Sequence, residues 1–128
     1  MIKEPRILVV DDEPAIRQVV SAQLRKAGHT VEQAGDAETA LERLLRGDID
    51  IVLSDIKLPN MSGIDLLRKA RASNIDTAFI MMTAFGSIET AIGAIKEGAY
   101  DYVSKPFKLD EIKLTIRRAL EQKRLLQE

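Results

Sequence analysis

The sequence predicts one α/β domain in which helices cover both faces of a parallel sheet. Short apolar runs of strand length alternate five times with segments whose apolar residues recur at helical spacing. Several of these runs are continuously apolar, which is typical of strands that are buried on both faces. We therefore expect five strands joined by right-handed crossovers, in the doubly wound, flavodoxin-like order 2-1-3-4-5, with five flanking helices.

The first half of the chain shows clear starts and stops. Strands are predicted over the ranges 7–10, 30–34 and 51–53. The first helix begins at Pro14, which suits a first helical turn, and it ends before Gly28. Asp36 is expected to cap a second helix that stops at Gly47.

The second half continues the alternation. Ser62, followed three residues later by Asp65, is typical of a capping box that opens the third helix. Two further strands are predicted over the ranges 78–82 and 100–103. Ser87 is expected to cap the helix between them, whose inward side chains are predicted to be Ile88, Ala91, Ile92 and Ile95.

The last helix is predicted to start near Leu109, and 20 residues remain from there to the end of the sequence. Its inward positions have heptad-like spacing that is interrupted by Lys123. We expect a core-facing helix whose last turns fray. The alternative is that the residues beyond Ala119 lead towards another domain or a partner helix. The domain is expected to span 1–122, with 123–128 as a linker stub.

Composition limits the possible partners. Nineteen basic and twenty acidic residues leave a net charge of −1, which provides no general attraction to nucleic acid or to an anionic membrane. The sequence has no cysteine, so it forms no disulfide framework. Its first apolar run is too short for a signal peptide or a membrane helix. We expect a cytoplasmic protein without a direct nucleic-acid or membrane partner.

Polar side chains follow four of the predicted strands. Asp11 and Asp12 come after the first strand and Asp55 after the third, while Thr83 and Lys105 follow the fourth and fifth. In the order 2-1-3-4-5 these strand ends are neighbours, so the side chains converge at one edge of the sheet. Carboxylates packed this closely repel one another unless they bind a cation or a proton. Oxygen ligands alone favour a hard ion such as Mg²⁺.

This constellation suits phosphoryl transfer. Asp55, central in the row, is the natural nucleophile for an aspartyl phosphate. Lys105 would neutralise one phosphoryl oxygen and Thr83 would donate a hydrogen bond to another. Taken alone, Asp55 has a simpler interpretation as a solvated loop acid or a local cap, and the neighbouring strand ends favour the phosphoryl site over it.

Four motifs occur in order along the chain: Val9-Val10-Asp11-Asp12-Glu13, Leu53-Ser54-Asp55 with Pro59 and Gly63, Met82-Thr83-Ala84, and Ser104-Lys105-Pro106-Phe107. Together they resemble the receiver domain of two-component response regulators, over residues 5 to 122. The runs at 82–87 and 98–102 are most similar to receivers of sigma-54-dependent, NtrC-like activators. In that subfamily an AAA+ ATPase and a helix-turn-helix follow the receiver. The chain is then a fragment or a stand-alone receiver, and its helical tail favours the fragment.

The resemblance implies a metal site and a residue that accepts a phosphoryl group. Asp55 is similar to the phospho-acceptor of the family, and Asp11 and Asp12 to its acidic pair. Asp12 and Asp55 would ligate Mg²⁺ beside the backbone carbonyl of Lys57, with Asp11 in the same acidic site.

The resemblance also implies a switch. Thr83 matches the switch hydroxyl, Lys105 the phosphate-binding lysine, and Tyr102 the aromatic residue whose rotamer follows Thr83. The Lys105–Pro106 peptide bond is expected to be cis, as in the family.

The implied function is that of a signalling module rather than an enzyme, beyond self-phosphorylation and autodephosphorylation. A sensor histidine kinase would phosphorylate Asp55. The face formed by the fourth helix, fifth strand and fifth helix would then change for an effector, such as an AAA+ ATPase in transcription control, or for a homodimer.

Three alternatives belong to other classes. A nucleotide- or flavin-binding enzyme would need a phosphate-binding loop where Asp11-Asp12-Glu13 stands, and these acids would repel a phosphate that lacks a metal. A phosphatase with an aspartate nucleophile would carry it on the first strand in an Asp-x-Asp arrangement. A pseudo-receiver that acts only as an interaction module typically lacks an acid, the threonine or the lysine, and this sequence has all of them.

Overall fold

The computed structural model of the chain describes residues 5–83, 88–105 and 108–127. Its strands form one parallel five-stranded sheet in the order β2-β1-β3-β4-β5, which confirms the predicted topology. The strands are β1 (Arg6–Val10), β2 (Thr30–Ala34), β3 (Ile51–Asp55), β4 (Ala78–Thr83) and β5 (Asp101–Ser104).

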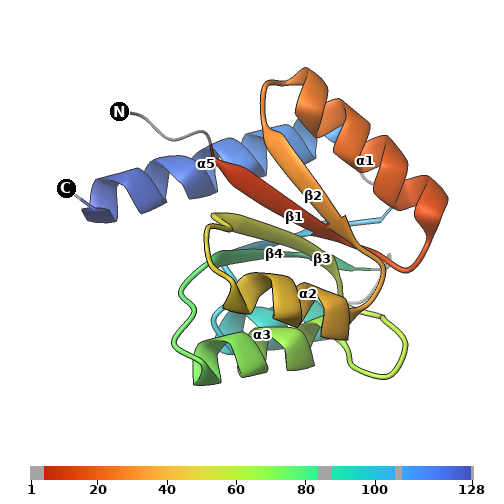
Figure 1. The fold of residues 1–128 in the computed structure, drawn as a ribbon, viewed down its shortest axis with the longest axis vertical. Helices are drawn as coiled ribbons and strands as arrows, with labels where there is room; N and C mark the ends of the chain where they lie inside the picture. The colour runs from red at the N-terminus through yellow and green to blue at the C-terminus, as the bar shows by residue number, and fades with distance from the viewer. Residues whose placement is uncertain (1–4, 84–87, 106–107, 128) are drawn as a thin grey trace.

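Helices cover both faces of this sheet, as predicted (Figure 1). They are α1 (Pro14–Lys26), α2 (Ala37–Leu45), α3 (Gly63–Ala72), α4 (Ile88–Lys96) and α5 (Leu109–Gln127). Residues of α2, α3 and α4 share one buried cluster, and residues of α1 and α5 share the other. The core is therefore two apolar layers, one on each side of the sheet.

The strands supply both layers because their side chains alternate between the two faces. On β1, Leu8 and Val10 belong to the cluster under α2 and α3, whereas Ile7 and Val9 belong to the cluster under α1 and α5. All four are at most 1% exposed. Burial on both faces explains why this strand is a continuous apolar run rather than an alternating pattern.

Local capping signals predicted the helix starts well. The side chain of Asp36 accepts a hydrogen bond from the N–H of Thr39 at 2.7 Å. Ser62 and Asp65 form the predicted capping box, in which each side chain accepts from the backbone N–H of the other. Ser87, the expected cap of α4, lies outside the described residues.

The predicted inward face of α4 is partly wrong. Ala91 and Ala94 are fully buried, whereas Ile92 and Ile95 are 47% and 39% exposed. The side chain of Ile88 is not among those described. Isoleucine is the more apolar residue, but the two alanines lie three residues apart on one helical face and let α4 approach the sheet closely.

Helix α5 is continuous to Gln127. That its last turns fray in solution stays a prediction. Ile112, Ile116 and Ala119 are buried against the sheet, as the spacing predicted. Lys123 extends this face, and its Nζ lies 3.3 Å from Oδ1 of Asp50. The division of the chain at residue 122 stays a prediction.

Within the described part of the chain, no helix is both long enough and apolar enough to span a membrane.

Candidate phosphoryl and cation site

All the polar side chains that were predicted to converge at the ends of the strands lie at the carboxyl edge of the sheet. Asp11 and Asp12 directly follow β1, Asp55 and Thr83 end β3 and β4, and Lys105 follows β5. The parallel registers place these ends beside one another, because Asp55 is paired with Met82 and Thr83 with Ser104. The convergence inferred from the strand order is therefore present.

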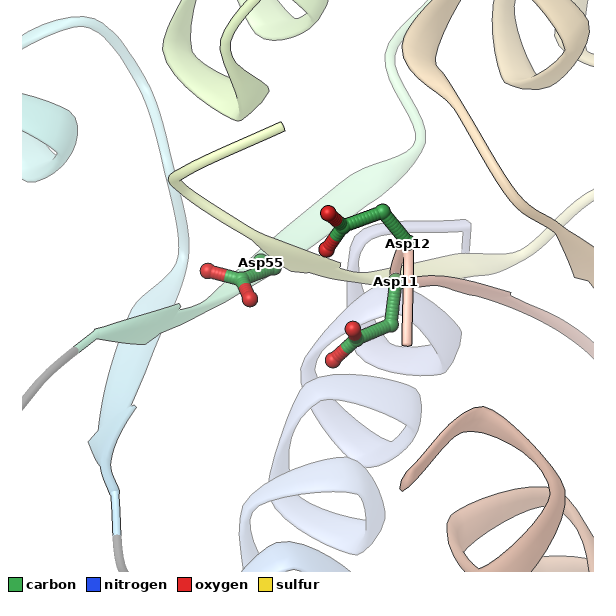
Figure 2. Close-up of side chains that lie close together, drawn as sticks. All are labelled: Asp11, Asp12 and Asp55. Carbon is green, nitrogen blue, oxygen red and sulfur yellow. The ribbon is translucent and has the colours of Figure 1, made fainter. Parts of the chain in front are cut away.

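The three carboxylates form a compact group. One oxygen from each of Asp11, Asp12 and Asp55 lies within 4.8 Å of the others. Figure 2 shows the three side chains side by side at the ends of β1 and β3. Asp11 is fully buried and Asp55 is 8% exposed, whereas Asp12 is open to solvent. Two anions with little access to water require a compensating charge nearby.

Lys105 provides part of that compensation. Its Nζ lies 2.7 Å from Oδ2 of Asp55 and 3.4 Å from Oδ2 of Asp11. Burial alone would lower the pKa of the Lys105 amine, but the hydrogen bonds and charges of Asp55 and Asp11 together raise this pKa above its ordinary value. Lys105 is therefore an ammonium at neutral pH, and it faces the side chain that was predicted to accept a phosphoryl group.

Backbone N–H groups hold two of the carboxylates. The N–H of Lys57 donates to Oδ1 of Asp55 at 3.1 Å. The N–H of Glu13 donates to Oδ1 of Asp11 at 2.9 Å. In both residues one carboxylate oxygen is fixed by the backbone and the other faces Lys105, so these side chains are positioned before any ligand arrives.

Gly63 allows the loop after Asp55 to close against β3. Its N–H donates to the carbonyl of Ile56 at 2.8 Å. A Cβ on Gly63 would clash with the backbone oxygen of Asp55 and lie 3.1 Å from Oγ of Ser54. The start of α3 thus packs directly on the backbone of Asp55.

A cleft of about 360 Å³ opens beside Asp55. Its walls include Lys57, Thr83 and Lys105, which the sequence singled out, and Thr90 on α4, which it did not. Thr90 carries no motif signal, because only the packing of α4 brings it to the cleft. A larger cavity, about 540 Å³, lies at the opposite end of the sheet beside Tyr100. It contains none of the clustered carboxylates, so the chemistry favours the smaller cleft.

The two switch candidates lie on neighbouring strands. Thr83 is 3% exposed at the end of β4. Tyr102 on β5 is half-buried and packs on the cluster that also contains Ala94 of α4. Pro106 lies outside the described residues, so the expected cis peptide bond is not described.

The donor set fits a hard divalent cation. All the clustered donors are carboxylate oxygens, and Asp12 is open to solvent where an ion would keep its waters. Lys105 supplies one positive charge against three carboxylates, so a further cation is favoured electrostatically.

The fold and this site define a class of protein, and comparison with known families identifies it. The family described as "Response regulator receiver domain" matches residues 7–117. The chain belongs to this family, the receivers of two-component systems. Receivers are signalling modules that bind Mg²⁺ at an acidic pocket, and response regulators partner with histidine kinases and output domains.

Its relatives include transcriptional regulators. The regulatory protein AtoC of Escherichia coli K12 is 42% identical over 116 residues, which cover 91% of this chain and 25% of AtoC. The C4-dicarboxylate transport transcriptional regulatory protein DctD of Rhizobium meliloti is 38% identical over 128 residues, 100% of this chain and 28% of DctD. The chain thus spans about a quarter of the length of these two relatives.

A solved structure confirms the fold. The receiver domain of NtrX from Brucella abortus is 40% identical in sequence and superposes with a TM-score of 0.85. The match covers 90% of this chain and 98% of that one. Together with AtoC and DctD, it confirms the resemblance to receivers of NtrC-like activators.

Proposed function

We propose that this chain is a phospho-acceptor switch, in which Asp55 takes a phosphoryl group from a phosphohistidine of a sensor kinase. One observation carries the proposal: the ammonium of Lys105 lies 2.7 Å from Oδ2 of Asp55, in a cleft that also receives the carboxylate of Asp12. A buried carboxylate beside a fixed cation is suited to attack an anionic phosphorus centre.

Asp55 acts as the nucleophile in this reaction. One carboxylate oxygen of Asp55 forms a bond to phosphorus while the bond from phosphorus to the kinase imidazole nitrogen breaks, and the imidazole leaves with its bonding electrons. Lys105 pairs with the transferred phosphoryl oxygens, and Thr83 hydrogen-bonds one of them. Asp11, Asp12, Asp55 and the backbone carbonyl of Lys57 would hold Mg²⁺, which supplies charge neutralisation between the carboxylates and the phosphoryl group.

The proposed output is a population shift at α4, β5 and α5. Thr83 moves towards the phosphoryl group and Tyr102 turns inwards into the space that Thr83 leaves. Ile92 and Ile95 on α4 and Leu114 on α5 are apolar and at least 39% exposed, which supports a role for this face in binding. The partner is an effector domain such as an AAA+ ATPase, or a second receiver, acting in the cytoplasm.

Intact-mass spectrometry tests the acceptor chemistry. The chain is incubated with Mg²⁺ and acetyl phosphate, and we expect a mass gain of one phosphoryl group. Asp55→Asn keeps the shape of the side chain but removes the nucleophile, so it should gain nothing. Adding EDTA to the wild type removes Mg²⁺ and should strongly slow the gain in mass. A wild-type chain that never becomes heavier under these conditions contradicts the proposal.

A further inference from the structure

An arginine outside the cluster reaches back to the turn that carries the acidic pair. Arg17 lies one turn into α1, and its Nη1 donates to the backbone carbonyl of Asp11 at 2.7 Å. Its Nε donates to Oε1 of Gln33 on β2 at 3.2 Å. One guanidinium therefore joins the end of β1, the start of α1 and the neighbouring strand β2.

That carbonyl belongs to the peptide unit that links Asp11 to Asp12. Asp11 is already fixed, because its N–H donates to the carbonyl of Ala34 and its carboxylate accepts from Glu13 and Lys105. The carboxylate of Asp12 is exposed and accepts no hydrogen bond from the described residues. Its direction depends on the peptide plane before it, which is the plane that Arg17 holds.

The chain leaves room for the guanidinium. A Cβ on Gly35, just after β2, would lie 3.3 Å from Nη1 of Arg17, which is tighter than ordinary van der Waals contact. The missing Cβ of Gly35 thus leaves space for Nη1 of Arg17 beside the end of β2, while the guanidinium donates to Asp11 and Gln33.

We propose that Arg17 is a positioning residue for the cation site, fixing the Asp11–Asp12 peptide plane so that the Asp12 carboxylate faces the same ion as Asp55. This inference rests on the proposed function, because it concerns the Mg²⁺ that the acceptor chemistry uses. Groups that orient metal ligands commonly change metal affinity by about 10–100-fold when removed.

The charge of Arg17 and its hydrogen bond to Asp11 predict opposite changes in the affinity for Mg²⁺ when Arg17 is replaced. A guanidinium near the site repels a dication, so loss of its charge alone would tighten Mg²⁺ binding. Loss of the hydrogen bond to the Asp11 carbonyl frees the Asp12 carboxylate and weakens binding. A purely structural role would lower stability and leave the affinity for Mg²⁺ unchanged.

Calorimetric titration of the whole chain with Mg²⁺ separates these roles. We expect Arg17→Ala to weaken binding about tenfold, at the low end of the range for such groups. Arg17→Lys keeps the charge but loses the branched guanidinium. Its affinity for Mg²⁺ should fall between that of Arg17→Ala and that of the wild type. Arg25→Ala is the matched control, because Arg25 also lies on α1 and donates to a β2 carbonyl, that of Val31 at 2.9 Å. It should leave the affinity for Mg²⁺ unchanged.

The outcomes are distinct. If the wild type binds Mg²⁺ and Arg17→Ala binds it equally well or more tightly, the positioning role is overturned while the proposed function stands. If the wild type binds no Mg²⁺, the cation site fails, and this inference fails with it. Urea unfolding checks that each variant is folded. Should Arg17→Ala be unfolded, Arg17→Lys carries the test, and wild-type affinity in that variant overturns the inference.

Discussion

At the scale of single residues, Lys105 and a bound cation compete for the same carboxylates. The ammonium contacts Asp55 and Asp11, whose oxygens are also the candidate ligands. In Lys105→Met that competition disappears, so we expect Mg²⁺ to bind several-fold more tightly, measured by calorimetry. Phosphorylation by acetyl phosphate should nevertheless slow, because the ammonium that pairs with the transferred oxygens is missing. Lys26→Met, at an exposed lysine in the last turn of α1, is the control. Unchanged Mg²⁺ affinity in Lys105→Met would contradict this account of the cluster.

The raised pKa of Lys105 sets the pH range of its contribution. Burial opposes the charge, but the contacts with Asp55 and Asp11 outweigh it and raise the pKa. A raised folded pKa adds stability that is fully present below the unfolded value, about 10.4, and is lost as the pH rises through the folded value. The stability difference between wild type and Lys105→Met should therefore stay constant between about pH 7 and pH 9.

At the scale of elements, the start of α3 depends on a glycine. In Gly63→Ala the new methyl would clash with the backbone oxygen of Asp55, and overpacking of this kind costs about 1–3 kcal/mol. We expect that loss in urea unfolding. Gly93→Ala is the control, because no neighbouring atom lies within 4 Å of its added Cβ, and it should gain about 0.5–1 kcal/mol. Equal stabilities of the two variants would show that α3 does not approach β3 so closely.

The start of α2 depends on a charged cap. The N–H of Thr39 donates to Asp36, and this hydrogen bond lowers the pKa of the Asp36 carboxyl. A lowered folded pKa adds stability that is present above the unfolded value and is lost as the pH falls through the folded one. Asp36→Ala should therefore cost about 0.5–2 kcal/mol at neutral pH.

The same variant should differ less from the wild type in acid, near pH 3, because the cap is then partly protonated. Urea unfolding at both pH values measures the difference. A difference that stays the same or grows in acid would be incompatible with an ionised cap.

At the scale of the whole molecule, local signals and strand order predicted most of the fold and the site. Asp36 and Ser62 were recognisable because capping is a property of a few consecutive residues. Asp11, Asp55 and Lys105 were recognisable because parallel strands end at one edge.

Contacts between distant elements were not recognisable from the sequence. The sequence favoured Ile92 over Ala94 on α4 because hydropathy does not report how closely a helix approaches a sheet. Arg17 contacts the Asp11 carbonyl and Thr90 lines the cleft because of how α1 and α4 pack, which no local pattern encodes. The roles proposed for Lys57 and Tyr102 came from the family resemblance alone.

The proposed switch requires that Asp55, among three clustered carboxylates, is the one that accepts the phosphoryl group. The most direct test is borohydride reduction of the chain after incubation with Mg²⁺ and acetyl phosphate, followed by peptide mapping, because reduction converts an aspartyl phosphate to homoserine. We expect homoserine at position 55 and aspartate unchanged at positions 11 and 12. Homoserine at position 11 or 12, or at no position, would contradict the proposed function.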